Sequence, residues 1–360
     1  MTTPIISILI DTYNHERHIE QAIVSVLEQN FPAKEMEIVV VDDGSTDRTP
    51  EIVGKFVPRV RYVRKKNGGQ ASAFNACIPE LRGRIVSFLD GDDWWAKEKL
   101  QVIAQAFERN PGIAAVGHGF YEVRDNEPPH DMFVPARTCH LDVSSIESAR
   151  LADAGLTMLG TSRLSVRREI LNRIGPLPEE LVFCADAPIF TLALALGGAL
   201  VLDQALCYYR QHSQSLFAHD PNNLASVRRK FEMIGFLLSY VPPRLVEFGV
   251  VPEVIEALIE SSRTEFERAK LRFGEGGRWQ VFRTELRRFQ TNYQRPSPGY
   301  MLFECAVGAC ALILSPHSFY RLLDWYSRNN VKRFRGILGK PEPKVPPEFL
   351  ERRPVAEREL

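Results

Sequence analysis

Three aspartates fall within four positions of the segment FLDGDDWW, which spans residues 88–95. Asp90, Asp92 and Asp93 carry like charges that repel one another at this spacing, and the segment contains no Lys or Arg. Carboxylate oxygens are the ligands that hard divalent cations prefer, and such sites commonly keep positions open for water or phosphate oxygens. The segment therefore predicts a divalent cation that carries a diphosphate group.

The elements that would position these aspartates alternate along the first hundred residues. Apolar runs typical of buried strands occur at residues 5–10, 37–41, 60–63 and 84–89. Segments with helical spacing occur at residues 19–27, 49–56, 71–78 and 97–109. This alternation predicts βαβ units and a parallel sheet with helices on both faces.

Polar clusters follow all four predicted strands, at residues 11–14, 42–45, 67–70 and 90–93. In α/β sheets of this kind, ligands bind beyond the carboxyl ends of the strands. A solvated loop would explain any one of the clusters. Four clusters at the same edge of the sheet favour a binding site there.

The remainder of the chain has less regular patterns. We predict a strand at 113–123, a loop at 126–135, a strand that turns into a helix at 160–171, and a helix at 185–198 that ends in glycines. Charge-rich helices are expected from residue 217 to about residue 288, and the Pro-containing tail from residue 341 favours disorder.

Composition argues against some classes of protein. The 360-residue chain has 45 Lys plus Arg and 45 Asp plus Glu, so its charge gives no support to a nucleic-acid partner. Its six cysteines form no CxxC pair, which favours reduced thiols over disulfides or a zinc site. No basic and apolar leader precedes the first predicted strand, so we expect a cytoplasmic protein.

The longest apolar run, at residues 301–314, is too short to span a bilayer unaided. Basic residues with interleaved aromatic residues follow it, namely Arg321, Arg328, Lys332, Arg333, Arg335 and Lys340. Two interpretations stay open: a helix buried against protein, or a helix on an anionic membrane surface. The second interpretation would make the protein peripheral at the inner face of the cell membrane.

The sequence lacks the motifs of other nucleotide-binding and metal-binding proteins. No GxGxxG of a dinucleotide-binding protein opens the first helix, and no GxxxxGK[ST] of a P-loop protein occurs. Neither acidic cluster has the spacing of an EF-hand. Four motifs, in order, resemble those of family 2 glycosyltransferases: VVVDDGSTD, NGGQASAFNACI, SFLDGDDWW and CADAPIFTLALALGG with YYRQHSQSL. The resemblance covers residues 5 to about 216. It implies the α/β GT-A fold, a Rossmann-like mixed sheet flanked by helices, here with a helical C-terminal extension.

The resemblance also implies an organisation into domains. We expect a catalytic domain at residues 1–217, with a nucleotide-binding half at 1–110 and an acceptor half at 111–217. A helical region at 218–340 and a Pro-rich tail at 341–360 would follow it.

Roles for individual residues are implied in the same way. Nucleotide contacts would come from Asp11, Tyr13, Asp43, Asn67, Gln70, Asn75 and Asp90, with Asp43 matching the residue that contacts a uracil-type edge. Asp90 and Asp92 would form the DxD pair, and Asp92, Asp93 and His212 would hold Mg²⁺ or Mn²⁺. Asp186 would be the general base, for which a helix N-cap is the structural alternative.

Three positions depart from the pattern of the family. Asp11 stands where proline is usual, Phe74 where arginine is common, and Ala185 where many members have glutamate. The tryptophans of the acidic segment, Trp94 and Trp95, could stack on a sugar or pack beneath the acidic loop. Contacts to the sugar are expected within residues 117–142 and 158–163.

The resulting hypothesis is a metal-dependent, inverting transfer of a sugar from a nucleotide-diphosphate donor, with UDP-sugars favoured. The acceptor would be a hydroxyl of a glycan or lipid-linked molecule in polysaccharide biosynthesis, and Asp186 would take its proton. Two alternatives stay open. One is nucleotidyl transfer to a sugar phosphate, which usually uses a Gly-rich loop that this N-terminus lacks; the other is non-catalytic binding of a nucleotide sugar.

Overall fold

The computed structural model describes most of the chain. The described residues are 3–124, 127–129, 131–156, 159–212, 224–295, 298–323, 325–326, 342–343 and 351–354. The predicted domain boundary at residues 217 and 218 lies outside them, and so do the basic residues Arg328, Lys332, Arg333, Arg335 and Lys340.

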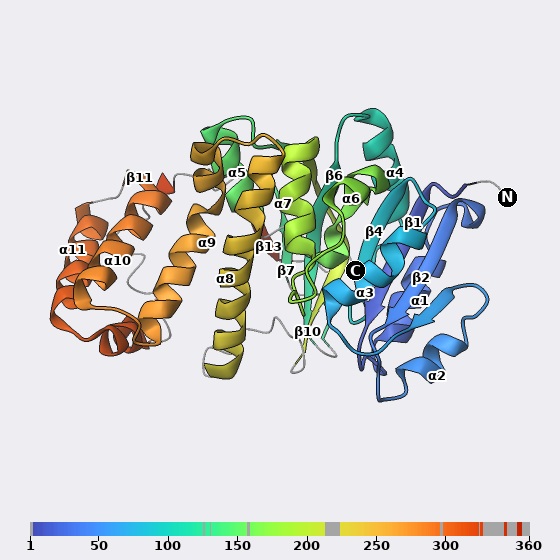
Figure 1. The fold of residues 1–360 in the computed structure, drawn as a ribbon, viewed down its shortest axis with the longest axis horizontal. Coiled ribbons are helices and arrows are strands. Elements are labelled where there is room, and N and C mark those ends of the chain that lie inside the picture. The colour runs from blue at the N-terminus through green and yellow to red at the C-terminus, as the bar shows by residue number, and fades with distance from the viewer. Residues whose placement is uncertain are drawn as a thin grey trace.

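Four parallel strands form the N-terminal half of the main sheet. In spatial order they are β3 (Arg61–Arg64), β2 (Met36–Asp42), β1 (Ile6–Thr12) and β4 (Ile85–Asp90). The accompanying helices are α1 (Ile19–Leu27), α2 (Thr49–Gly54), α3 (Gln70–Cys77) and α4 (Lys99–Arg109) (Figure 1). The predicted alternation of strands and helices in this half is confirmed.

Both faces of this half-sheet are buried, which explains its continuous apolar runs. Successive side chains of a strand point to opposite faces. Ile8 and Ile10 therefore join one apolar cluster, with α1 and α4, whereas Leu9 joins the other, with α3. A strand covered on both sides is apolar at nearly every position.

The second half makes the sheet mixed. β9 (Ser165–Arg167) pairs antiparallel with β4 and with β6 (Ala115–Arg124), and β10 (Ala199–Gln211) runs parallel to β6. Three shorter strands complete this half: β5 (Trp94–Trp95), β7 (Asp131–Val134) and β8 (Cys139–Leu141). β5 and β8 pair antiparallel with β10, and β7 pairs antiparallel with β6.

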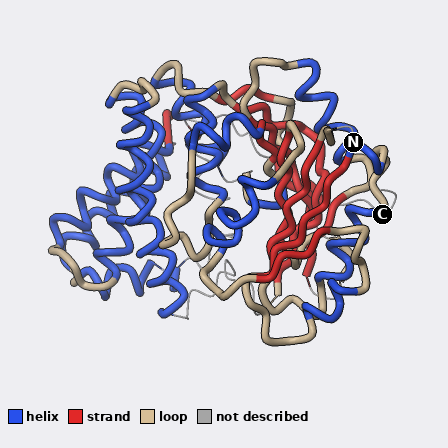
Figure 2. The backbone as a smooth tube through the Cα atoms, turned by 45° about the vertical axis from the view of Figure 1, so that its right-hand side comes forward, coloured by secondary structure: helices blue, strands red, loops and turns tan. Residues whose placement is uncertain are grey.

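Helices follow and cover this second half. They are α5 (Ile146–Gly155), the 3₁₀ turn η4 (Thr161–Arg163), α6 (Arg168–Ile174) and α7 (Asp186–Leu196). Four longer helices then form a bundle that extends away from the sheet (Figures 1 and 2): α8 (Leu224–Glu247), α9 (Pro252–Arg272), α10 (Arg278–Asn292) and α11 (Pro298–Ile313). Two further 3₁₀ turns are η1 (Ala33–Glu35) and η2 (Ile78–Glu80).

Three predicted features differ in the structure. The loop predicted at 126–135 contains β7, and the long strand β10 was not predicted because its sequence mixes polar and apolar residues irregularly. The disorder predicted for the tail is wrong for six of its residues: β12 (Glu342–Pro343) pairs with β11 (Tyr293–Arg295), and β13 (Glu351–Pro354) pairs with β7. Tertiary pairing supplies hydrogen bonds that a local reading of proline content does not anticipate.

A search of the described helices finds none with both the length and the apolar character needed to cross a membrane.

Candidate active site

Two carboxylates meet at the carboxyl edge of the central strands. Asp11 is the penultimate residue of β1 and Asp90 is the last residue of β4, and the two are register partners in the parallel pair. Burial and the charge of Asp92 raise the pKa of Asp11 to about 8. Burial and the charges of Asp11 and Asp92 likewise raise the pKa of Asp90 well above its usual value. The predicted convergence of polar loops at this edge therefore occurs, and it concentrates negative charge.

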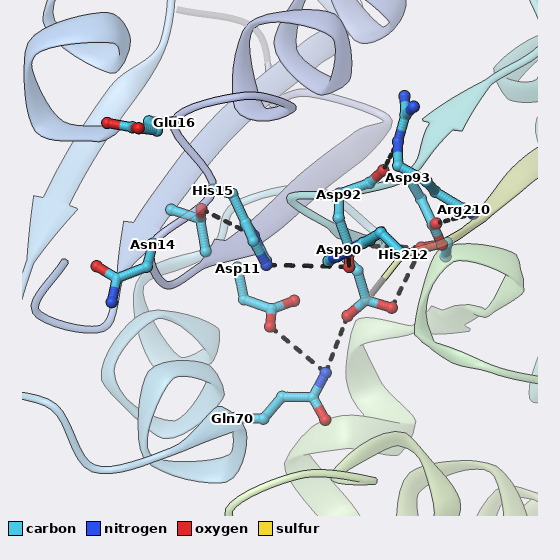
Figure 3. A network of polar contacts seen from close by, with 12 residues as sticks. Asp11, Asn14, His15, Glu16, Gln70, Asp90, Asp92, Asp93, Arg210 and His212 are labelled. Atoms are coloured by element: carbon cyan, nitrogen blue, oxygen red, sulfur yellow. Dashed lines mark hydrogen bonds and ion pairs between the residues drawn. The ribbon is translucent and has the colours of Figure 1, made fainter. Parts of the chain in front are cut away.

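Gln70, the first residue of α3, bridges this pair (Figure 3). Its Nε2 lies 3.0 Å from Asp90 Oδ1, 3.4 Å from Asp11 Oδ2 and 3.1 Å from the hydroxyl of Thr161. Its Oε1 accepts a 3.0 Å hydrogen bond from the backbone N–H of Ala185. One amide thus connects β1, β4, η4 and the start of α7.

Asp92 lies on the other side of the acidic loop, against two histidines (Figure 3). Its Oδ2 is 2.9 Å from His212 Nε2 and 3.9 Å from His15 Nε2. Burial alone would raise the pKa of Asp92, but His15 and His212 hold it below its usual value. Gly91 permits this approach, because a Cβ there would lie 2.7 Å from His15 Nδ1 and from Thr12 Oγ1.

Asp93 points into the protein and connects the loop to β10. Its Oδ1 accepts a 2.9 Å hydrogen bond from the backbone N–H of Arg210, and the guanidinium Nε of Arg210 donates to the Asp92 carbonyl at 2.9 Å. Burial and Asp92 raise the pKa of Asp93 to about 7. Only 2% of Asp93 is exposed. Its side chain thus contacts the backbone of β10 and does not join Asp92 and His212.

The donor set fits a hard divalent cation in part. Among the described residues no group of three or more His, Cys, Asp or Glu side chains is arranged to hold a metal ion. Asp92 and His212 nevertheless converge, and Asp11 Oδ1 is buried without a hydrogen-bond partner in an acidic surrounding. Mg²⁺ is commonly held by one or two protein ligands, with water and substrate phosphates completing its shell. Two converging protein ligands are compatible with that pattern.

Asp186 is the first residue of α7, and its charge contributes to the raised pKa of Asp11 and of Asp90. Burial raises its pKa, while Arg163, nearby backbone N–H groups and the Thr161 hydroxyl oppose the rise. The residue two positions earlier, Cys184, has a φ of 61°, a left-handed conformation that is uncommon for a side chain other than glycine. A strained backbone before a buried carboxylate is a feature that clusters at functional sites.

The remaining predicted nucleotide-binding residues lie in different surroundings. Asp43 is buried, and its two oxygens accept from Lys65 Nζ and from the backbone N–H groups of Gly68 and Gly69. Its carboxylate therefore holds the 65–69 loop, and its contact to a base stays a prediction.

The loop residues Tyr13 and Asn67 are exposed near the carboxyl ends of β1 and β3, where a base or ribose could reach them. Asn75 is different, because its amide donates to the carbonyl of Leu177 at 2.7 Å and accepts from the Leu177 N–H at 2.8 Å. Both ends of this amide are occupied by packing contacts, so the geometry gives no support to a nucleotide contact.

The sequence does not distinguish Ser162, whose side chain and backbone hold the acidic loop in place. Its hydroxyl lies 3.1 Å from the Asp90 N–H and 3.3 Å from Asp90 Oδ2. Its carbonyl accepts from Trp95 Nε1 at 2.9 Å and from Lys99 Nζ at 2.7 Å. Ser162 lies within residues 158–163, where the sequence predicts contacts to the sugar, but nothing in its residue type distinguishes it as a support for Asp90.

The two tryptophans pack against protein. Trp95 is buried under the Lys99 ammonium, which lies 3.6 Å from its ring centre. Trp94 stacks on Tyr208 at 5.0 Å between ring centres, and the Arg210 guanidinium lies 4.5 Å from its ring. Of the two interpretations left open for this pair, these contacts favour packing beneath the acidic loop.

Residues 7–175 match the family model described as glycosyl transferase family 2. An uncharacterized glycosyltransferase of Nostoc sp. is 33% identical over 214 residues, which cover 58% of this chain and 65% of that protein. Chondroitin synthase of Pasteurella multocida is 34% identical over 116 residues, which cover 31% of this chain and 12% of that protein. The matched segment spans less than two thirds of the length of each relative.

A solved structure with a related fold is that of S. aureus TarS 1-349 in complex with UDP-GlcNAc. It aligns with a TM-score of 0.51 and 20% sequence identity, over 90% of this chain and 91% of that chain. At this identity the likeness shows the fold alone, and the fold is the GT-A arrangement expected from the sequence.

Proposed function

We propose that this chain, in which residues 7–175 belong to glycosyl transferase family 2, transfers a sugar from a nucleotide-diphosphate donor to an acceptor hydroxyl. The donor would be a UDP-sugar and the acceptor a glycan or a lipid-linked molecule. The reaction would invert the configuration at the anomeric carbon, since a single displacement places the acceptor opposite the leaving diphosphate.

One observation carries the proposal: Gln70 connects the acidic loop to the candidate base. Its Nε2 is 3.0 Å from Asp90, and its Oε1 accepts from the N–H of Ala185, the residue directly before Asp186. A displacement reaction needs the acceptor and the donor to be held in a defined relative position. The hydrogen bonds of Gln70 fix the position of the acidic loop relative to the start of α7, where the candidate base lies.

The chemistry of Asp186 suits proton removal. Burial raises its pKa, which makes the carboxylate a stronger base than an exposed aspartate. In the proposed step Asp186 takes the proton of the acceptor hydroxyl while the oxygen of that hydroxyl forms a bond to the anomeric carbon. The bond from that carbon to the diphosphate breaks, and the nucleoside diphosphate leaves.

Mg²⁺ or Mn²⁺ is proposed as the cofactor. Asp92 and His212 would hold it, because Asp92 Oδ2 and His212 Nε2 converge at 2.9 Å. When bound, such an ion stabilises the negative charge that develops on a departing diphosphate. Asp93 would help to fix the conformation of the acidic loop, because it accepts a hydrogen bond from the backbone N–H of Arg210.

The identities of donor and acceptor rest on relatives. TarS, which shares the fold, is described in complex with UDP-GlcNAc, and this supports a uridine donor. Part of the chain matches a chondroitin synthase, and this similarity supports a role in polysaccharide biosynthesis.

The test is release of nucleoside diphosphate from a panel of UDP- and GDP-sugars, with and without Mn²⁺ and candidate acceptors. We expect release that depends on both acceptor and metal, and that is lost in Asp186→Asn. Asp203→Asn, which changes an exposed aspartate of β10, is the matched control and should keep full activity. Binding of donor without release for any acceptor would instead support a non-catalytic binding protein. Pyrophosphate release from a nucleoside triphosphate and a sugar phosphate would support nucleotidyl transfer.

A further inference from the structure

The outer surface of α11 has an unusual composition. All exposed residues of this helix are apolar: Pro298, Met301, Leu302, Cys305, Ala306, Ala309, Leu312 and Ile313. Leu302 is 72% exposed and Ile313 is 69% exposed. The opposite face, with Val307 and Ala311, packs in a small apolar core with Val281 of α10. A helix that buries one apolar face and exposes another is expected to have a partner for the second.

The neighbouring helix α10 adds positive charge beside this apolar face. Its exposed residues include Arg278, Arg283 and Arg287, together with Trp279, which is 59% exposed. α10 packs against α11, and both helices lie at the end of the molecule far from β1 and β2 (Figure 1).

The carboxylates of the two helices are turned inward. Glu285 is buried between Arg268 and Arg288, with contacts of 2.9 Å and 2.8 Å. Glu304 contacts Arg288 at 3.4 Å. Among residues 278–290 of α10 and 298–313 of α11, every exposed charged side chain is therefore positive.

We propose that the α10–α11 face binds the surface of an anionic lipid bilayer. An apolar face flanked by arginines and a tryptophan matches the chemistry of such a surface, where apolar side chains enter the acyl boundary and cations contact lipid phosphates. At 16 residues α11 is roughly 24 Å long, so it would lie along the surface rather than cross it.

Charge argues against a second copy of the chain as the occupant. A two-fold interface brings the same patch of both subunits together. The exposed arginines of the two copies would then be brought close with no exposed carboxylate on either helix to pair with them. An anionic surface has the complementary charge.

The experiment is co-sedimentation of the full chain with vesicles of phosphatidylcholine that contain or lack phosphatidylglycerol, at low and high salt. We expect binding to the anionic vesicles that weakens with salt. Leu302→Glu combined with Ile313→Glu should abolish it. Arg283→Gln combined with Arg287→Gln should weaken it about 25-fold, because each basic residue near an anionic surface contributes about fivefold.

Two control variants change equivalent residues elsewhere. Val246→Glu replaces an exposed apolar residue of α8, and Arg150→Gln replaces an exposed arginine of α5. Both should bind vesicles like the unmodified protein, and circular dichroism should show that all variants keep their helix content. The altered side chains are exposed, so unfolding is not expected.

The proposal is overturned if the protein does not bind anionic vesicles at low salt, or if the α11 variants bind as well as the controls. A dimer that dissociates in Leu302→Glu, without vesicle binding, would show that the face binds a second copy. Vesicle binding does not depend on sugar transfer, so this result and the release assay are independent of each other.

Discussion

His212 Nε2 lies 2.9 Å from Asp92 Oδ2, although 120 residues separate the two in the chain. β10 carries the histidine to the acidic loop, because it pairs with β5 directly after that loop. If this pair holds the cation, Asp92→Ala and His212→Ala should both weaken donor binding in the presence of Mn²⁺. Calorimetric titration of a UDP-sugar with Mn²⁺ and with EDTA measures the effect. Donor affinity that is the same in EDTA would contradict the metal role of both residues.

Asp186 is expected to act in the chemical step and not in donor binding. In Asp186→Asn the amide keeps the shape of the side chain but no longer accepts a proton. We expect kcat to fall by about 10²–10⁴-fold with the donor Kd nearly unchanged. Comparison of turnover with donor titration separates the two. Turnover close to that of the unmodified enzyme would leave Asp186 with only a structural role at the start of α7.

Gln70 is expected to position groups that react. In Gln70→Leu the hydrogen bonds to Asp90 and from Ala185 are lost, while the volume of the side chain is similar. We expect a decrease in kcat larger than the change in donor KM, because the relative placement of acceptor and donor is disturbed. The conservative variant Gln70→Asn should not rescue activity, since its amide is one methylene shorter. A Gln70→Leu enzyme with normal kcat would contradict the positioning role.

Asp11 makes stability depend on pH. Its pKa is raised from 3.8 to about 8 in the folded protein, so between these values the folded state holds a proton that the unfolded chain has lost. Stability should therefore fall as pH rises through this window. Asp11→Asn removes the penalty, and at pH 8 it should raise the free energy of unfolding by roughly 5 kcal/mol, because a pKa difference of one corresponds to about 1.4 kcal/mol.

Urea denaturation at several pH values tests the prediction for Asp11. Below about pH 4 the aspartate is protonated in both states, so the difference between variant and parent should vanish there. A difference that stays constant between about pH 4 and pH 8 would show that the titration of Asp11 is not its cause.

Glu285 is expected to stabilise the C-terminal bundle. It is buried and accepts from Arg268 on α9 and from Arg288 on its own helix. Glu285→Ala leaves two partly buried guanidinium groups without this partner, which should cost about 3 kcal/mol or more in stability. Glu256→Ala, which breaks an exposed pair with Arg263, is the control and should cost less than about 1 kcal/mol. Chemical denaturation of both variants provides the comparison, and equal losses would contradict the importance of burial.

The strand and helix pattern of residues 5–109 was predictable because it follows from local periodicity. β1 and β2 are covered on both faces, so most of their positions are apolar, and α1 and α4 show the spacing of a helix with one buried face. The position of Asp11 and Asp90 at one edge followed from the same pattern, since parallel strands end on the same side. β10 was missed because its register with β6 shifts twice, which removes a regular alternation.

By itself, the sequence determined the class of fold, the edge at which the polar loops collect, and the residue types that can serve as metal ligand and base there. Only the tertiary structure decided which of these residues meet. It directed Asp93 inward to Arg210, occupied both ends of Asn75 with Leu177, and joined Gln70 to Ala185. The physical reason is that such contacts join segments far apart in the chain, so their geometry depends on how the sheet and helices pack. No local periodicity records that packing.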